Sequence, residues 1–294
     1  MQLKNFLFFI TAVFIWGSTW LAIKFQLGTV DPLVSIFYRF LLASLLLFLY
    51  LLFTGKNFKY TIRQHSLMAL QGFLLFGINY WLVYIAELNL TSGLVAIIFS
   101  TIVFLNIFFG AFFLKTKIRP RVFFGALTGF IGISFVFKSE IISFSMSSEN
   151  SVAILIALLG AITASLGNIT SAYNQSKKIP VLQTNAFGML YGALLMLLLT
   201  LILKKPINFN ASFSYISSLF YLSVFGSIIA FSCYLTLLGN IGADKAGYAT
   251  LVIPVIAIIL STIFEGYQWN KFILIGIVLI SVGNILVLKR QKTK

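Results

Sequence analysis

The residues of this chain that could act on another molecule are polar side chains set inside long apolar runs. Hydrocarbon offers such groups no partner, so polar side chains at membrane depth commonly mark the path of a substrate or an ion. None of them is paired with a catalytic partner, so we predict a binding site for a small-molecule substrate and no catalytic residue. The candidate binding residues are Trp16, Ser18, Asn79, Tyr80, Tyr84, Ser100, Thr101, Asn168, Tyr234 and Tyr248.

Each candidate also has a purely structural interpretation. Serine and threonine in membrane helices often bond to their own backbone, so packing is as good an interpretation as binding for Ser18, Ser100 and Thr101. Tryptophan can simply face lipid. Tyr80 and Tyr84 are four residues apart and therefore share one helix face, which favours a cavity wall for this pair.

Four further residues are assigned to gating or to structure: Lys24, Arg39, Pro254 and Glu265. Arg39 lies inside the second apolar run, where a guanidinium is costly unless it is paired or reaches outward. It could draw a substrate carboxylate into an outer mouth together with Lys24. We favour the alternative, a structural bond to helix-end carbonyls or to an acid such as Glu87 or Glu265.

What the chain lacks excludes several kinds of chemistry. It has one histidine, His65, and one cysteine, Cys233. It therefore offers no metal site, no disulfide framework and no serine–histidine pair, and we predict neither an enzyme nor a cofactor. Its six acids lie in loops or at the ends of apolar runs. Because no carboxylate stands at mid-membrane, a neutral, zwitterionic or anionic metabolite fits better than a cation exchanged for protons.

Composition indicates which elements hold these residues. Of the 294 residues, 60% are hydrophobic and 9% are charged, which leaves too little polar surface for a water-soluble protein. A membrane helix needs about 20 mostly apolar residues. We predict an all-α integral membrane protein with ten transmembrane helices, near residues 5–25, 33–53, 66–86, 91–114, 121–137, 152–173, 182–203, 213–237, 245–265 and 271–288.

The basic residues predict the orientation, because lysine and arginine are enriched on the cytoplasmic side. With the N-terminus in the cytoplasm, most of them fall on that side. The net charge of +15 then reflects membrane topology, and no nucleic-acid partner is expected. We predict a multi-pass protein of the plasma (bacterial inner) membrane with both termini in the cytoplasm.

The sequence also contains an internal repeat. The phrase from 79 to 117, an apolar run, a small-residue hinge and a second apolar run, returns from 233 to 268. This predicts two five-span halves, residues 1–143 and 144–294. Since five is odd, the second half enters the membrane from the opposite side. Such inverted repeats usually enclose a substrate site near the midplane.

Several phrases in order resemble the EamA-type members of the drug/metabolite transporter superfamily. They are W-G-S-T-W-L-A-I-K (16–24), Y-R-F-L-L-A-S (38–44), T-S-G-L-V-A-I-I (91–98) and V-I-P-V-I-A-I-I-L-S-T-I-F-E-G (252–266). The resemblance implies a ten-helix metabolite exporter in which spans 1, 3, 4, 6, 8 and 9 surround a cavity and spans 5 and 10 stand apart. Phe104 replaces a proline usual in the family, so we expect the fourth span to be less bent than the ninth, which keeps Pro254.

Together these patterns predict a secondary transporter that exports a small metabolite, such as an amino acid, by alternating access. The alternative is a flippase for a lipid-linked sugar or another amphiphile. The expected partners are the small-molecule substrate and membrane lipid, and a homodimer stays open.

Overall fold

The computed structural model describes residues 3–118, 120–136, 138, 148–247, 249–266 and 268–288, and all regular structure in these ranges is helical. The first half of the chain contains α1 (Leu3–Lys24), α2 (Pro32–Phe53), α3 (Ile62–Gly72), η1 (Phe73–Ile78), α4 (Asn79–Ala86), α5 (Ser92–Phe99), α6 (Ile102–Leu114) and α7 (Pro120–Val136). The second half contains α9 (Glu149–Ser176), α10 (Val181–Ile202), α11 (Phe213–Tyr221), η2 (Leu222–Ile229), α12 (Ala230–Ile241), α13 (Ala243–Ala246), α14 (Ala249–Glu265) and α15 (Lys271–Leu288).

Seven stretches of the described chain are long and apolar enough to cross a membrane. They are Leu3–Lys24, Pro32–Phe53, Ile62–Ala86, Ser92–Leu114, Glu149–Ser176, Val181–Ile202 and Phe213–Ile241. Three shorter apolar helices are Phe123–Val136, Val252–Glu265 and Lys271–Gly283. The predicted all-helical, multi-pass membrane class is therefore confirmed.

Local chemistry explains where the second and third spans begin. The Asp31 carboxylate accepts a hydrogen bond from the Leu33 N–H at 3.0 Å, and Pro32 occupies the first turn of α2, where its missing N–H costs nothing. At the start of α3, Thr61 and Gln64 cap each other's backbone N–H groups reciprocally, which satisfies two otherwise unpaired donors.

Two π-helical segments occupy matching places in the two halves. η1 lies inside the span Ile62–Ala86, and η2 lies inside the span Phe213–Ile241. In η2 the Ser227 hydroxyl donates to the Leu222 carbonyl, five residues earlier. π-helical turns are rare and are frequent at functional sites. Both segments lead directly into helices that line the centre of the bundle.

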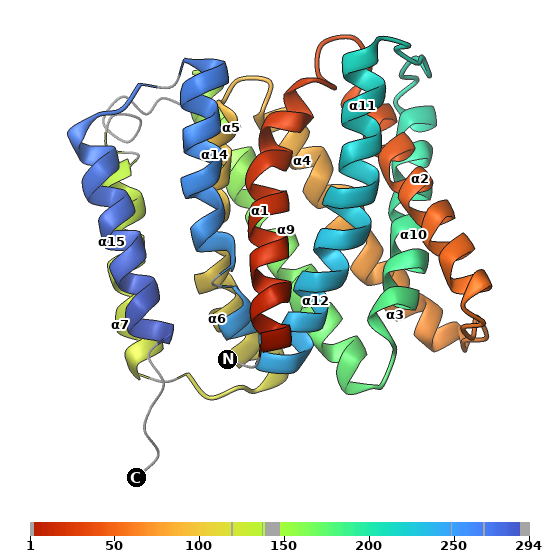
Figure 1. Cartoon of the computed structure of the whole chain (residues 1–294), viewed down its shortest axis with the longest axis horizontal. Helices are drawn as coiled ribbons and strands as arrows, with labels where there is room; N and C mark the ends of the chain where they lie inside the picture. The colour runs from red at the N-terminus through yellow and green to blue at the C-terminus, as the bar shows by residue number, and fades with distance from the viewer. Residues whose placement is uncertain are drawn as a thin grey trace.

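α7 and α15 form a pair at one edge of the bundle, as Figure 1 shows. Each of them contacts the other far more than it contacts any remaining helix. Glycines permit this close pairing. A Cβ on Gly132 would lie 2.7 Å from the Gly276 carbonyl oxygen, and one on Gly283 would lie 2.5 Å from that of Gly125. The expectation that these two helices stand apart from the core is confirmed.

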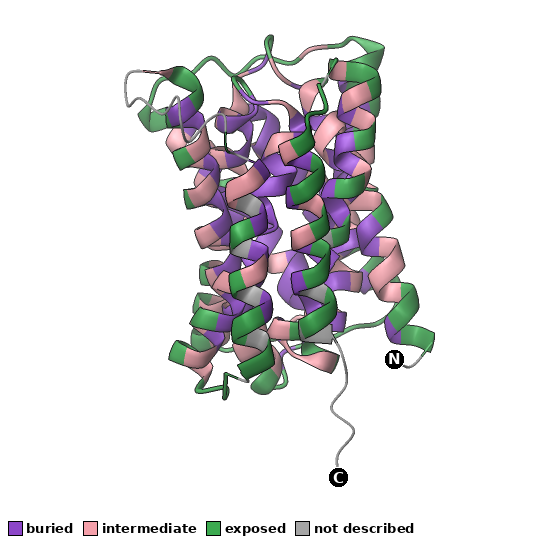
Figure 2. Ribbon diagram, turned by 90° about the vertical axis from the view of Figure 1, so that its left-hand side faces the viewer, coloured by how far each residue is buried: buried purple, intermediate pink, exposed green. Residues whose placement is uncertain are grey.

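Buried residues gather at the centre of the bundle and exposed ones on its outside, as the colours in Figure 2 show, and many of the exposed residues are large and apolar. Phe14, Phe112 and Ile263 are 63%, 70% and 66% exposed. A soluble protein rarely exposes contiguous apolar surface of this extent. These outward faces are therefore the surface that contacts lipid.

The fourth span is interrupted even though Phe104 stands where the family usually has a proline. α14 runs unbroken through Pro254, whereas the fourth span is interrupted at Ser100 and Thr101, between α5 and α6. Both hydroxyls bond to carbonyls three residues earlier, at 2.6 and 2.7 Å. Such bonds compete with the helical hydrogen-bond ladder. An interruption of this span therefore does not require a proline.

The contact between α3 and α10 allows a first test of the packing. A Cβ on Gly72 would lie 2.2 Å from the Gly188 carbonyl oxygen, so we expect Gly72→Ala to force the helices apart and to cost about 1–3 kcal/mol of stability. The measurement is the melting temperature in detergent. Gly77→Ala is the control, because its Cβ would meet the flexible Leu195 and Met196 side chains at 3.2 and 3.4 Å. Equal losses in the two variants would contradict the prediction.

Candidate functional site

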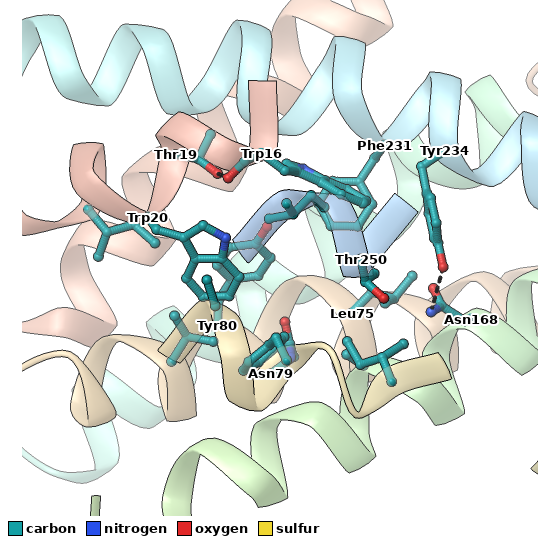
Figure 3. Close-up of a pocket in the computed structure, with 17 residues that line it drawn as sticks. Trp16, Thr19, Trp20, Leu75, Asn79, Tyr80, Asn168, Phe231, Tyr234 and Thr250 are labelled. Atoms are coloured by element: carbon teal, nitrogen blue, oxygen red, sulfur yellow. Dashed lines mark hydrogen bonds between the residues drawn. The ribbon is translucent and has the colours of Figure 1, made fainter. Parts of the chain in front are cut away.

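A central cavity of about 70 Å³ lies between the two halves of the chain. Its walls come from α1, η1 and α4, α5 and α6, α9, α12, and α14. Because η1 and α4 belong to one span, as do α5 and α6, these elements make up six spans, which are the ones expected around a cavity. This volume is well below the roughly 300–1,000 Å³ of typical ligand pockets, so the cavity is small for a ligand site. The lining residues labelled in Figure 3 are Trp16, Thr19, Trp20, Leu75, Asn79, Tyr80, Asn168, Phe231, Tyr234 and Thr250.

Interlocked aromatic rings form much of the wall. The Trp16 ring lies 4.8 Å from the Phe231 ring and 4.9 Å from the Tyr234 ring, centroid to centroid. The Trp16 indole N–H donates to the Gly226 carbonyl oxygen at 3.1 Å. Edge-to-face contacts and this hydrogen bond hold the indole in one orientation, so Trp16 presents a rigid apolar surface to the cavity.

The polar groups of the cavity are few and neutral. The Asn79 amide donates to a backbone carbonyl of α9 at 2.8 Å, and the Asn168 amide donates to the Tyr234 hydroxyl at 3.2 Å. The Thr19 hydroxyl donates to the Trp16 carbonyl of its own helix, and the Thr250 hydroxyl donates to the Gly247 carbonyl, just before α14. No described residue that lines the cavity is charged. The site can therefore stack against and hydrogen-bond a solute, and it offers no group for covalent chemistry.

Five residues predicted from the sequence are brought together here: Trp16, Asn79, Tyr80, Asn168 and Tyr234. They come from α1, α4, α9 and α12, which are far apart in the chain. The helix assignments alone could not have shown which faces of these four helices meet.

Three predicted hydroxyl residues lie outside the cavity lining. Ser18 bonds to the Tyr221 hydroxyl at 2.7 Å and to its own helix. Ser100 and Thr101 bond to their own backbone, which is the structural interpretation that the sequence left open. Tyr248, the remaining candidate, lies outside the described residues.

Tyr84 corrects the expectation of a shared tyrosine face. Tyr80 lines the cavity, but Tyr84 does not. Its side chain is fully buried, and its hydroxyl donates to the side-chain amide oxygen (Oε1) of Gln26 at 2.6 Å. Four residues along α4 move Tyr84 one turn beyond the small cavity and into contact with the chain after α1. The spacing was read correctly, but the cavity is too short to reach both rings.

Other residues of the cavity lining were absent from the predicted set, and three of them are Trp20, Phe231 and Thr250. Helical spacing was a usable signal for two of them. Trp20 lies four residues after Trp16, and Phe231 lies three residues before Tyr234, so each shares a face with a predicted residue. No comparable signal marks Thr250.

Arg39 is fully buried, and its contacts within the described chain are neutral groups. Its Nε donates to the Ser227 hydroxyl at 3.0 Å, and its Nη2 lies 3.4 Å from the Tyr80 hydroxyl. The guanidinium carbon lies 4.3 Å from the centroid of the Tyr80 ring. Arg39 therefore ties α2 to η2 and α4 without an acid, and it places a positive charge behind one wall of the cavity.

Charged groups contact one another at the end of the bundle where α1 finishes. The Lys24 ammonium donates to the carbonyl oxygens of Glu87 and Leu90 and lies 3.7 Å from the Glu265 carboxylate. Glu265 also accepts hydrogen bonds from the Ser92 hydroxyl and backbone N–H. These contacts tie α1, α5 and α14 together at this end.

The Glu87 side chain at the same end is fully buried, one residue beyond the span Ile62–Ala86. Among the residues that the structure describes, neither of its carboxylate oxygens has a hydrogen-bond partner. Burial raises the pKa of the Glu87 carboxyl well above its ordinary value, although the nearby Lys24 charge opposes this shift. Closure at this end therefore favours a protonated Glu87.

The opposite end of the cavity is closed by neutral amides. The Asn106 side-chain oxygen accepts hydrogen bonds from the Ser165 hydroxyl at 2.8 Å and from the Asn168 amide at 3.4 Å. Asn106 was not predicted. The available signal was an amide in the apolar run of α6, since such a group at membrane depth needs a partner.

The profile of the EamA-like transporter family matches residues 3–138 and 151–289. The protein named uncharacterized inner membrane transporter YedA, from Escherichia coli, is 29% identical over 281 residues, which are 92% of this chain and 89% of its own. The uncharacterized transporter YoaV of Bacillus subtilis is 24% identical over 99% of this chain and 100% of its own.

A protein crystal structure with 19% sequence identity superposes with a TM-score of 0.75, over 98% of this chain and 97% of that one, and it shows the same fold. The relatives are named as transporters and not as enzymes, in agreement with the prediction. Two family matches that together span most of the sequence lead to one conclusion: this chain belongs to the EamA-like transporter family.

Proposed function

We propose that this protein exports a small metabolite, such as an amino acid, across the bacterial inner membrane by alternating access. The observation that carries the proposal is the central cavity, because its walls come from both halves of the chain. Contacts of Lys24 with Glu265 close one end, and contacts of Asn106 with Asn168 close the other. Rocking of two halves around such a site would open the ends in turn.

The proposed topology has ten spans in two inverted halves, with both termini in the cytoplasm. The three shorter apolar helices occupy the places of the fifth, ninth and tenth spans. The π-helical segments, each inside the third span of its half, support a repeat. The start of α1 and the end of α15 lie at the same end of the bundle (Figure 1), as this topology requires.

The cavity favours a substrate with an apolar or aromatic body and few polar groups. Rings dominate its wall, and its lining within the described residues carries no charge. A charged ligand loses its hydration on entry and needs a compensating group. Arg39, in contact with the Tyr80 ring, supplies positive potential for a carboxylate. An amino acid with an apolar side chain combines these features.

Counterflow in proteoliposomes tests the proposal. Vesicles containing the purified protein are loaded with one unlabelled amino acid at a time and placed in a trace of the radiolabelled form. We expect accumulation with apolar and aromatic amino acids that protein-free vesicles do not show. Absence of counterflow with every amino acid would contradict the proposed substrate class. Movement of a fluorescent lipid-linked sugar without amino-acid counterflow would instead support a flippase.

A matched pair of tyrosine variants tests which ring faces the substrate. Tyr80→Phe removes a hydroxyl at the cavity wall, and we expect the KM for counterflow to rise about tenfold, as for loss of one hydrogen bond to a charged group. Tyr84→Phe removes a hydroxyl bonded to Gln26 away from the cavity, so it should lower the melting temperature and leave the KM unchanged. Similar KM values for the two variants would contradict this assignment.

A further inference from the structure

A second cavity lies beyond the amide-closed end of the central one. It measures about 390 Å³ and is lined by residues of α6, α9 and α12 and of the short helix α13. Its polar lining includes Asn106, Thr116, Gln175, Asn240 and Asp244. In the proposed topology this is the cytoplasmic end of the bundle.

One residue layer separates the two cavities. Asn106 lines the second cavity, whereas Asn168 and Tyr234 line the central one. These three side chains are joined directly, since the Asn168 amide lies 3.4 Å from the Asn106 oxygen and 3.2 Å from the Tyr234 hydroxyl. Their exposed fractions are 0%, 3% and 1%. A solute that passed from one cavity to the other would have to part this layer.

The layer connects the two halves of the chain. Asn106 belongs to α6 in the first half, whereas its partners Ser165 and Asn168 belong to the second half, as does Tyr234, which accepts a hydrogen bond from Asn168. The Asn106 amide also donates to the Ala243 carbonyl in α13 at 3.3 Å. A displacement of α6 relative to α9 and α12 would therefore break several of these bonds together.

The strength of the bonds suits a closure that opens and recloses. Three of them, at 3.2, 3.3 and 3.4 Å, lie at or beyond the long end of the usual 2.7–3.2 Å range for N–H···O bonds. All are between neutral groups, which are weaker than charge-assisted ones. The Lys24 end, by contrast, is held by charged groups.

The backbone next to the layer is a short helix flanked by two glycines. α13 has four residues and follows Gly242, whose φ of 93° is a conformation that favours glycine. A Cβ on Gly247, just after α13, would lie 3.4 Å from the Asn106 amide nitrogen. The short helix therefore packs closely against Asn106, between two glycines that can absorb a change in its position.

We propose that Asn106 is the latch of an inner gate, in which its hydrogen bonds to Asn168 and Ser165 separate the central cavity from the cytoplasmic one. Release of Asn106 joins the two cavities into one path open to the cytoplasm. This inference rests on the proposed alternating-access function. It assigns to Asn106 a positioning role, because Asn106 controls access to the substrate site without forming its wall.

Thiol labelling tests the gate without any substrate. Ala164 lines the central cavity, so Ala164→Cys is introduced as a reporter into a Cys233→Ser background. Inside-out membrane vesicles expose the cytoplasmic face to a membrane-impermeant methanethiosulfonate. We expect Asn106→Ala to speed labelling of the reporter at least about fivefold, the population shift that loss of one ordinary hydrogen bond produces.

Two companion variants keep the test decisive. Tyr234→Phe removes only a hydroxyl, preserves the ring and should also speed labelling. Ser176→Ala should not speed labelling, because the Ser176 hydroxyl lies in the second cavity and donates to the Tyr173 carbonyl of its own helix. Unchanged labelling in both Asn106→Ala and Tyr234→Phe, with monodisperse protein, would overturn the gate. Because no transported solute is used, this outcome is separate from a failure of amino-acid counterflow.

Discussion

Trp16→Ala is expected to reduce counterflow by about 100-fold, because truncation of an aromatic residue at the centre of a binding surface costs about 3 kcal/mol of binding free energy. The Trp16 ring contacts the Phe231 and Tyr234 rings, and its N–H is bonded to the Gly226 carbonyl. The truncation would remove the surface that a solute stacks against and would loosen both neighbouring rings. Initial rates of counterflow in proteoliposomes measure the effect.

Two variants show whether this loss belongs to the cavity. Trp16→Phe keeps an aromatic surface and loses the hydrogen bond to Gly226, so it should retain an intermediate rate. Phe14→Ala truncates a ring of the same helix that is 63% exposed toward lipid, and it should behave like the unmodified protein. If Phe14→Ala were as defective as Trp16→Ala, the effect would reflect damage to α1 and not loss of a binding surface.

Glu87→Gln is expected to remove most of the pH dependence of stability between pH 4.5 and the raised pKa of the Glu87 carboxyl. Burial raises the pKa of the Glu87 carboxyl well above 4.5, with Glu265 adding to the shift and Lys24 and Arg39 opposing it. The folded protein therefore binds this proton more tightly than the unfolded chain does. The resulting stability is complete below pH 4.5 and is lost as the pH rises toward the raised pKa.

Each pH unit within this window costs about 1.4 kcal/mol, or a few degrees of melting temperature at about 2–4 °C per kcal/mol. Glutamine is always neutral, so the variant should have a flatter profile and a higher melting temperature at pH 8. Glu265→Gln is the control. It weakens the contact with Lys24 and should lower the melting temperature while a clear slope persists. Parallel profiles for Glu87→Gln and the unmodified protein would contradict a protonated Glu87.

The architecture was largely predictable from the sequence. A continuous run of apolar residues indicates a span. Local capping residues, such as Asp31 with Pro32, indicate where the helix begins. Both signals act over a few neighbouring residues and need no knowledge of the rest of the fold. The packing glycines of α7 were predictable for the same reason, since small residues in an apolar helix usually mark close helix contacts.

The distortions inside the spans were harder to predict. Nothing in the residues of η1 or η2 distinguishes a π-helical turn from an α-helical one. At the fourth span, Ser100 and Thr101 interrupt the helix although proline is absent there. Their hydroxyls could bond to substrate, to another helix or to their own backbone. The balance between these alternatives depends on what the neighbouring helices leave open.

The candidate site, too, was only partly predictable from the sequence. Residue chemistry selected polar and aromatic candidates, and the family resemblance implied the six spans around the cavity, which Trp16, Tyr80 and Asn168 do line. Packing between helices that are distant in the chain decided the rest. It sent the Tyr84 hydroxyl to Gln26, buried Arg39 against Ser227, and joined Asn106 to Asn168. A periodic pattern states which residues share a helix face, but only contacts between distant segments determine which face meets the cavity.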